Sequence, residues 1–195
     1  MKIYMTGAKG FTLVEILIVT LLFAIASTIL SQTFVSFNKL QRRVANAATL
    51  AQDMRFATEM LVREARNKSV NFSAYGVDEA ASSTVLHLTS SAGTEDIAIQ
   101  SGATCADLSG AQCLAMSIDG GVTWNPITST HVNVRRFGVY IRPTVSPFSP
   151  VSGSYPNNIQ PVVTFLLDMN YLGTNTSDTV TLVSQTSVDS RMYQR

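Results

Sequence analysis

One acidic side chain lies inside an otherwise uncharged apolar segment near the start of the chain. Residues 11–30 (FTLVEILIVTLLFAIASTIL) contain Glu15 as their only charge. Twenty helical residues span about 30 Å, the hydrocarbon thickness of a bilayer, and a carboxylate there costs roughly 2.5–3.5 kcal/mol. The nearest cation, Lys9, lies on the other side of Gly10. Glu15 therefore needs a partner from another chain, or one that is created by cutting this chain.

The residues around this acid follow the order of a processing signal. Lys9-Gly10 precedes Phe11, which is followed by Thr12-Leu13-Val14-Glu15-Ile16-Leu17-Ile18-Val19. This order resembles the type IV prepilin signature, which pilins, minor pilins and the pseudopilins of type II secretion share. The resemblance implies that a membrane-embedded peptidase cuts between Gly10 and Phe11 and N-methylates Phe11. It also implies that Glu15 serves assembly.

Cutting after Gly10 would supply the missing partner. It exposes an α-amine on Phe11, and Glu15 of one subunit could pair with that amine in a neighbour. The pair would set the axial register between helices, as a buried polar residue does in coiled coils. The alternative is a simple signal anchor whose Glu15 reaches back to the interface. An ordinary secretory signal fits less well, because the small residues after the apolar region (Ala26-Ser27-Thr28) form a weak cleavage site.

A long helix must carry these residues. No Gly or Pro occurs from Phe11 to Tyr75, which predicts one helix over 11–68, about 87 Å long. Its second half has an apolar or small stripe at 3–4 spacing: Phe37, Leu40, Val44, Ala47, Ala51, Met54, Thr58, Leu61 and Ala65. Opposite charges four residues apart occur at Arg55–Glu59, Glu59–Arg63 and Glu64–Lys68. The stripe favours packing on the chain's own sheet over a coiled-coil dimer.

Short alternating segments follow and predict strands. They are Thr84–Thr89, Asp96–Gln100, Cys113–Ile118, Val122–Ile127, Val132–Arg142, Pro161–Tyr171 and Thr179–Ser187. In Val132–Arg142 the apolar phase shifts, which predicts a bulge near Arg135-Arg136. Residues 143–161, rich in Pro, Ser, Gly and Asn, read as a long surface loop. The predicted fold is α+β, an antiparallel sheet domain packed on the second half of the helix.

Two cysteines, Cys105 and Cys113, flank a polar loop. An even count in a domain outside the cytosol predicts a disulfide, which would contribute about 2–3 kcal/mol. A metal site that recruits His87 or His131, both expected on strands, is the alternative, and the spacing does not favour it.

One motif resembles the Asp-box of sialidases and other β-propellers (S-x-D-x-G-x-T-W). It runs from Ser117 through Asp119 and Gly121 to Trp124. A single copy predicts a well-specified hairpin turn and implies no sialidase activity. A second segment, from Asp168 to Asp178, has oxygen ligands for Ca²⁺ but few carboxylates, which favours a hairpin turn.

Composition points to no catalysis. Fourteen basic and thirteen acidic residues give a net charge of +1, so the overall charge of the chain does not attract nucleic acid. No Gly-rich phosphate loop, nucleophile elbow or triad context occurs, so we expect no enzyme activity, no cofactor and no metal. The basic run Lys39, Arg42 and Arg43 could bind lipid head groups or, in a competence pilus, DNA. A solvated helix face is its default interpretation.

The expected organisation has four parts: a leader (1–10), a transmembrane half-helix (11–30), a second half-helix (31–70) and an extracytoplasmic β-rich domain (71–195). Counting cations before the span (Lys2, Lys9) and after it (Lys39, Arg42, Arg43) does not decide the orientation. The resemblance places the leader in the cytoplasm. It thereby implies a single-pass protein of the inner (cytoplasmic) membrane.

The resemblance implies a structural filament subunit, a minor pilin or pseudopilin, loosely similar to the J-type pseudopilins and W-type minor pilins. The implied partners are other pilin or pseudopilin subunits, a prepilin peptidase/methyltransferase, an inner-membrane assembly platform and a cytoplasmic ATPase. The alternative function is a monomeric membrane-anchored adhesin or carbohydrate-binding module that uses the Asp-box hairpin.

Overall fold

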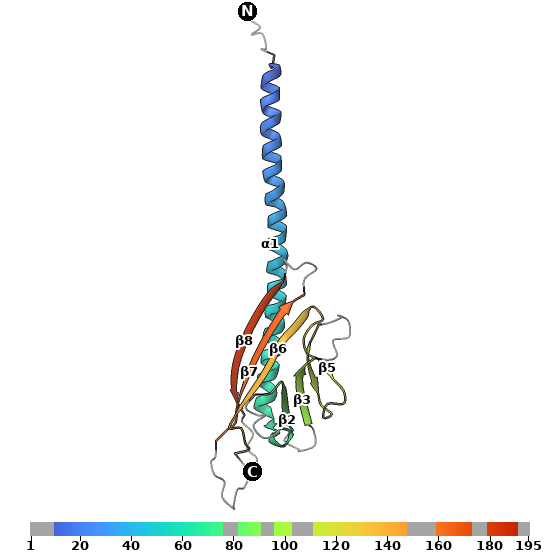
Figure 1. Ribbon diagram of the computed structural model, residues 1–195, viewed down its shortest axis with the longest axis vertical. Coiled ribbons are helices and arrows are strands. Elements are labelled where there is room, and N and C mark those ends of the chain that lie inside the picture. Colours follow the sequence, from blue (N-terminus) through green and yellow to red (C-terminus); the bar gives the residue numbers. More distant parts are fainter. Residues whose placement is uncertain are drawn as a thin grey trace, which may run out of the picture. The chain divides into compact units, whose positions relative to one another are not determined.

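The computed structural model describes residues 10–75, 82–90, 96–102, 111–147, 159–172 and 179–190. Along these ranges one long helix is followed by eight strands, which form two antiparallel sheets (Figure 1). Buried residues of the helix and of both sheets share one hydrophobic core. The chain thus has the α+β fold that its sequence predicts, a long amino-terminal helix packed on antiparallel sheets.

Helix α1 runs from Leu13 to Asn67, within two residues of the predicted bounds at each end. Its length follows from the absence of Gly and Pro, which leaves no residue to break the hydrogen-bond ladder. Arg66 lies in the last turn, where a cation interacts favourably with the helix dipole. A short 3-10 turn at Phe72–Ala74, which the sequence did not predict, follows the helix.

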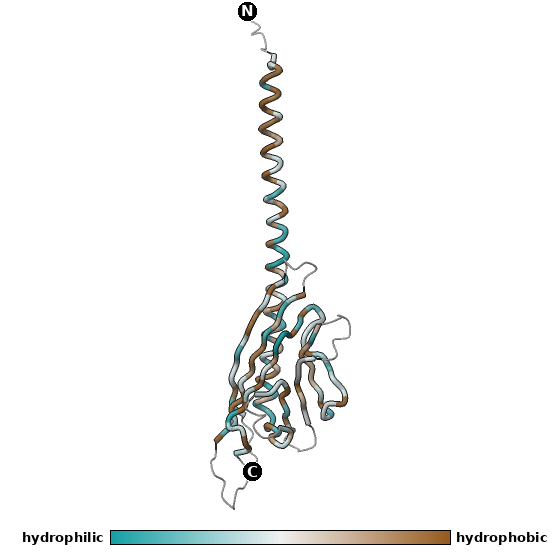
Figure 2. Tube along the Cα trace, in the orientation of Figure 1, coloured by the Kyte–Doolittle hydropathy of each residue, from teal (hydrophilic) through white to brown (hydrophobic). Residues whose placement is uncertain are grey.

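The chain divides into two compact units, Met1–Arg42 and Arg43–Arg195. In the described part of the first unit nearly every side chain is exposed, and the hydrophobic colouring is densest over the first turns of α1 (Figure 2). The second unit holds the last turns of α1 and all the strands, and the core lies there.

The buried stripe of α1 differs in phase from the predicted one. Leu50, Met54, Ala57, Leu61 and Ala65 are buried, whereas Ala51 is exposed and Thr58 is half-buried. Two apolar rows run side by side here, and the helix turns the row with the larger aliphatic side chain, Leu50, into the core. Burying Leu in place of Ala removes more apolar area from water. The predicted stripe was therefore wrong by one residue at two positions, and its first three members, Phe37, Leu40 and Val44, are exposed.

The first sheet has five strands in the order β1-β2-β3-β4-β5, and the second has three in the order β6-β7-β8. The strands are β1 (Ser69–Val70), β2 (Val85–Thr89), β3 (Asp96–Ser101), β4 (Leu114–Ser117), β5 (Asn125–Pro126), β6 (Val132–Arg142), β7 (Val162–Tyr171) and β8 (Val180–Asp189). Each of the seven predicted segments contains a strand, and β1 was not predicted. The segment Val122–Ile127 was predicted too long, because only Asn125–Pro126 pairs with β4.

The predicted bulge in β6 is confirmed. The register against β7 shifts between Val134 and Arg136, so Arg135 is the additional residue. The shift restores the alternation after two successive exposed arginines. As a result both Val134 and Phe137 are buried, opposite Met169 and Leu167 of β7.

Polar contacts join α1 to segments far away in the sequence. The carboxylate of Asp53 accepts hydrogen bonds from the Ser129 amide (3.3 Å) and from the Ser129 hydroxyl. At the end of the helix, the Lys68 carbonyl accepts a bond from the Ser190 hydroxyl (3.1 Å). These bonds position the helix against the turn before β6 and against the end of β8.

The four outer sheet edges differ in their protection. Strands β1 and β5 have two residues each, and β5 includes Pro126. Strand β6 has its bulge, and its Val139 exchanges two backbone bonds with Ser83 (2.8 and 2.7 Å). Strand β8 pairs with β7 over ten residues without a register shift and contains no Gly, Pro, Lys or Arg. Along the ranges given above, no strand covers its other edge.

Tyr75 fastens the segment after the helix to β2. Its hydroxyl accepts a bond from the His87 amide (2.8 Å) and donates one to the Val85 carbonyl (3.2 Å). The Tyr75 ring meets the His87 imidazole edge-on, with 5.3 Å between centroids. Burial raises the pKa of Tyr75 to about 12, and the bond from His87 opposes this.

Which side of α1 faces the core can be tested by introducing leucine at two positions that lie on neighbouring sides of the helix. The Ala57→Leu substitution should lower the free energy of unfolding by about 1–3 kcal/mol, because it overpacks a fully buried position. Ala51→Leu, at an exposed position, should change it by less than about 0.5 kcal/mol. Denaturant titration of the full chain in detergent, followed by Trp124 fluorescence, measures both. Equal effects would contradict the observed phase.

The contacts of Tyr75 with Val85 and His87, called the Tyr75 clamp below, should make the free energy of unfolding depend on pH in the alkaline range. Because its folded pKa is raised above the ordinary 10.0, its contribution is complete below pH 10 and is lost as the pH rises toward 12. Tyr75→Phe should cost about 1–2 kcal/mol at pH 7 through its lost hydrogen bonds, and the gap to the parent should narrow in that window. Tyr140→Phe is the control. A gap that stays constant up to pH 12 would refute the clamp.

Candidate functional site

The residues around the predicted processing point lie just ahead of α1. Gly10, Phe11 and Thr12 are exposed and have no regular secondary structure, and Leu13 is the first helical residue. The Thr12 carbonyl accepts bonds from the amides of Glu15 (3.1 Å) and Ile16 (3.2 Å), and its hydroxyl also accepts from the Glu15 amide (3.3 Å). Thr12 is therefore the N-cap of the helix.

Sequence reasoning missed this role of Thr12. The signal was present, because Thr12-x-x-Glu15 is the capping-box pattern that marks a helix start. Only the threonine half of the box is formed: the Glu15 carboxylate makes no hydrogen bond or ion pair within the described ranges. Lys9, its nearest cation in the sequence, lies outside those ranges.

Most hydroxyl groups farther along the apolar half of α1 are satisfied by the helix itself. Thr20 donates to the Leu17 carbonyl (3.0 Å) and Thr28 to the Ile25 carbonyl (2.7 Å). Ser31 and Thr33 make the same kind of bond, each 2.9 Å, to carbonyls four residues back. Such bonds leave no free donor to be desolvated in an apolar medium. Glu15 thus differs from these side chains in having an unmatched charge.

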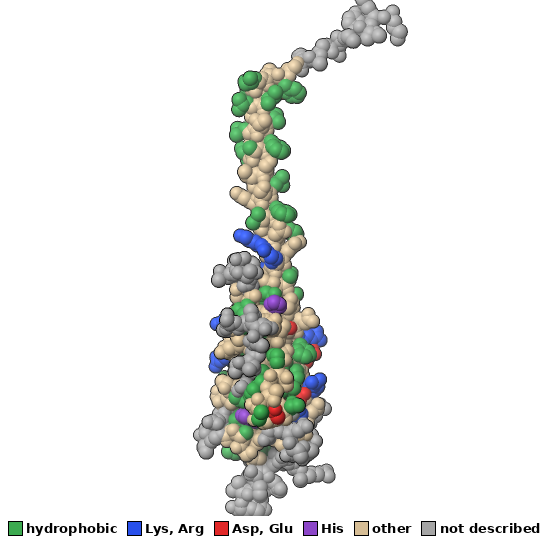
Figure 3. Space-filling model, turned by 90° about the vertical axis from the view of Figure 1, so that its right-hand side faces the viewer, with side chains coloured by type: hydrophobic (Ala, Val, Ile, Leu, Met, Phe, Trp, Pro, Cys, Tyr) green, Lys and Arg blue, Asp and Glu red, His purple; other side chains and the backbone are tan. Residues whose placement is uncertain are grey.

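By length and composition, α1 is the one helix in the described part of the chain that could cross a membrane, and its apolar window is not buried against the rest of the chain. On the face drawn in Figure 3, hydrophobic side chains cover the first turns, and charged side chains begin only farther along. Lys39, Arg42 and Arg43 mark that change, and all three are exposed without an ion pair in the resolved ranges.

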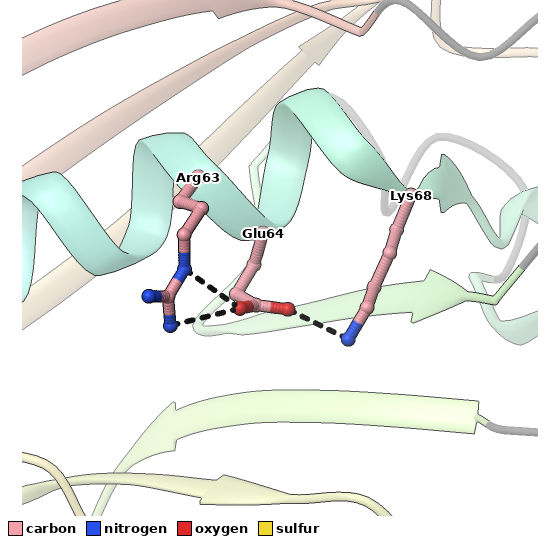
Figure 4. A network of polar contacts seen from close by, with 3 residues as sticks. All are labelled: Arg63, Glu64 and Lys68. Atoms are coloured by element: carbon pink, nitrogen blue, oxygen red, sulfur yellow. Dashed lines mark hydrogen bonds and ion pairs between the residues drawn. The ribbon is translucent and has the colours of Figure 1, made fainter.

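The second half of α1 holds its charges in pairs. The predicted pairs Arg55–Glu59 (2.7 Å) and Glu64–Lys68 (2.6 Å) are confirmed. The predicted pair Glu59–Arg63 is wrong, because Arg63 turns to Glu64, 3.4 Å away (Figure 4). Glu64 thereby bridges two cations, and its carboxylate is largely shielded. These contacts stabilise the helix, and they pair both Glu59 and Glu64 with cations of the same chain segment.

The Asp-box forms the predicted hairpin between β4 and β5. One oxygen of Asp119 accepts bonds from the Ser117 hydroxyl (2.6 Å) and from the amides of Thr123 (2.8 Å) and Val122 (3.1 Å). These bonds, led by the Ser117 hydroxyl, hold the pKa of Asp119 well below its usual range. Gly120 and Gly121 adopt φ of +72° and +98°, where glycine is favoured.

The Trp124 side chain packs against the turn of this hairpin. Its indole N–H donates to the Gly121 carbonyl (2.9 Å), and its ring lies 3.6 Å from where a Cβ on Gly121 would be. The bonds to Asp119 also explain why Val122 and Thr123 are not in a strand. Because the carboxylate and the indole N–H are both engaged within the turn, the arrangement favours a structural role over sugar binding.

The remaining candidate residues do not gather. Cys113 is fully buried just before β4, and Cys105 lies outside the described residues, so their disulfide remains a prediction. His87 lies in β2, whereas His131 lies in the turn before β6 and not on a strand as expected, close to the Tyr171 ring. Within the described residues no three His, Cys, Asp or Glu side chains come together as metal ligands.

The segment from Asp168 to Asp178, for which the sequence favours a hairpin turn over a Ca²⁺ site, begins inside the predicted strand β7. Asp168 and Asn170 belong to β7 and not to a loop, because the hydrophobic alternation of that strand continues to Tyr171. Asn170 accepts a bond from Asn133 (2.9 Å), and Asp168 faces Arg135 at 4.0 Å. Asp178 lies outside the described residues.

Comparison with known proteins bears on the amino-terminal segment. Residues 5–31 match the family model described as the prokaryotic N-terminal methylation motif. Neither the curated proteins nor the solved structures searched contain a match to the chain. The matched residues include Gly10, Phe11, the cap Thr12, Glu15 and the apolar turns of α1. The chain therefore carries the prepilin signature of type IV pilin-like proteins, at the start of a helix suited to anchor it in a membrane.

Proposed function

We propose that this protein is a structural subunit of a type IV pilus-like filament or of a type II secretion pseudopilus. It is inserted in the inner membrane as a prepilin, cleaved after Gly10, N-methylated on Phe11 and polymerised through its hydrophobic helix. The signature supports a structural subunit over an enzyme.

The observation that carries this proposal is the unmatched carboxylate of Glu15. It sits in the first turn of an exposed apolar helix whose neighbouring hydroxyls are already bonded. Cleavage after Gly10 creates the amine of Phe11, and Glu15 of one subunit pairs with the amine of the next. Each charge alone in lipid costs roughly 2.5–3.5 kcal/mol, so pairing favours assembly over the separate subunits.

The apolar side chains of the first unit supply the rest of the contact. Phe11, Leu13, Ile16, Leu17, Phe23 and Phe34 are all more than half exposed. The helical residues among them gather on one side, but the other sides are apolar too, with further side chains that are more than half exposed: Val14, Ile18, Val19, Leu22 and Ile29. A helix apolar on every side is suited to the centre of a bundle of like helices as well as to lipid.

The proposed division of the chain follows from this role. Residues 1–10 form the removed leader, 11–30 the membrane half of the helix, 31–70 its second half, and 71–195 the extracytoplasmic domain. Lys39, Arg42 and Arg43 lie about 14–20 Å beyond the membrane half of the helix, on the outer side of the bilayer. A disulfide between Cys105 and Cys113 agrees with an oxidising outer compartment.

The partners proposed for this subunit are other pilin or pseudopilin subunits, the prepilin peptidase/methyltransferase and the inner-membrane assembly platform with its ATPase. Nucleic acid is a partner only if the filament serves DNA uptake. The size of the domain and the arginines of the second half-helix agree with a minor pilin or pseudopilin of J-type or W-type.

Processing can be tested by mass spectrometry of the mature protein. The amino-terminal peptide should begin with N-methyl-Phe11, because the peptidase that cuts after Gly10 also methylates the new amine. Gly10→Val should leave the precursor intact and serves as the control. Recovery of an uncleaved amino terminus, at Met1 or at Met5 as a second possible translation start, would favour the membrane-anchored adhesin or carbohydrate-binding module.

Assembly can be tested at Glu15. The Glu15→Gln variant should still be cleaved, but its incorporation into filaments should fall about 100-fold, because the Phe11 amine loses its partner at a cost of roughly 2.5–3.5 kcal/mol. Glu59→Gln, an exposed acid of the same helix, is the matched control. The measurement is the fraction of subunit in sheared or sedimented filaments. Equal incorporation of the Glu15 variant and the parent would contradict the proposed pairing of Glu15 with the Phe11 amine of a neighbour.

A further inference from the structure

The proposed scissile bond lies very close to the start of a helix. The peptide between Gly10 and Phe11 precedes the first helical residue, Leu13, by only two positions. Phe11 is 76% exposed, and neither it nor Gly10 has regular secondary structure. A peptidase can reach a bond in this state, because its backbone groups are not engaged in a helix.

The atoms of Thr12 explain why the helix stops there. In an α-helix extended by one more turn, the Glu15 amide would donate to the Phe11 carbonyl, and the Val14 amide would donate to the Gly10 carbonyl. The second of these acceptors is the carbonyl that the peptidase must attack. In the structure the Glu15 amide is bound instead by the carbonyl and the hydroxyl of Thr12, at 3.1 and 3.3 Å.

The residues after Thr12 make this stop necessary. Leu13, Val14 and the following residues form an uninterrupted helix, and a helix that is already nucleated extends at little cost. Gly10 disfavours extension by about 1 kcal/mol relative to Ala, and an N-cap threonine contributes a similar amount. The cap and the glycine together keep the boundary at Leu13.

We propose that Thr12 is a positioning residue for cleavage: by capping α1 it leaves the Gly10 carbonyl outside the helix and open to attack. The proposal rests on the proposed function, since it concerns the same processing step. It assigns the hydroxyl a task in the precursor that is separate from any contact that Thr12 makes after assembly.

A series of substitutions separates capping from recognition of the threonine shape. If Thr12 acts as a cap, cleavage rates should follow N-cap preference: Thr12→Ser and Thr12→Asn should stay within about twofold of the parent, and Thr12→Val and Thr12→Ala should be about fivefold slower. If the peptidase reads the side chain by shape, the isosteric Val should be tolerated and Asn should not.

The experiment uses the full-length precursor in detergent with the prepilin peptidase, and initial rates are read from the mass of the product. Thr20→Val is the matched control, because the Thr20 hydroxyl bonds to the Leu17 carbonyl inside the helix and does not cap it. Its rate should equal that of the parent. Rates that are equal across the Thr12 series, or that rank by shape, would overturn the proposal.

A second measurement reports the helix boundary itself. In the parent the Val14 amide should exchange its hydrogen freely, and in the Thr12→Val precursor it should become protected as the helix extends toward Gly10. Unchanged exchange alongside slower cleavage would overturn the proposal. A parent precursor that is never cut between Gly10 and Phe11 would instead contradict the proposed function, so the two failures are distinguishable.

Discussion

A single unmatched carboxylate constrains the first unit of this protein. Most hydroxyl groups in the apolar half of α1 bond to carbonyls of the preceding turn, so the helix can lie in an apolar medium at little polar cost. Glu15 cannot be satisfied in this way, because its charge needs an opposite charge or water. The position of this acid, one turn from the processing point, connects the chemistry of the amino terminus with the association of helices.

The second unit solves a different problem with the same helix. Here α1 gives one row of side chains to the core, including Leu50 and Leu61, and the carboxylates of Glu59 and Glu64 are held in local ion pairs. The β6 bulge and the Tyr75 clamp then fit the strands and the chain after the helix onto this core. One continuous helix therefore serves two environments because its sequence is apolar up to residue 30, apart from Glu15 and a few hydroxyl residues, and amphipathic in its second half.

Much of this architecture was predictable because the signals are local. The absence of Gly and Pro predicts α1 to within two residues, alternation predicts β6 at its observed bounds, and the Asp-box predicts the hairpin of Asp119. The stripe phase was missed because Ala51 and Leu50 are both apolar, and only packing decides between them. The division into two sheets and the Tyr75 contacts join residues whose pairing no local pattern specifies. Thr12 was readable from its spacing to Glu15.

The unprotected outer edge of β8 has a consequence for the isolated subunit. Most natural edge strands are shortened, kinked or charged so that no other backbone can add to them, and three of the four edges described here follow that practice. Strand β8 is long and regular, and its single charge, Asp189, lies at its end. Such an edge strand is a template on which further β-strands can add in a cross-β arrangement. Protection against aggregation must therefore come from whatever keeps the subunits dilute, anchored or covered, and not from the strand itself.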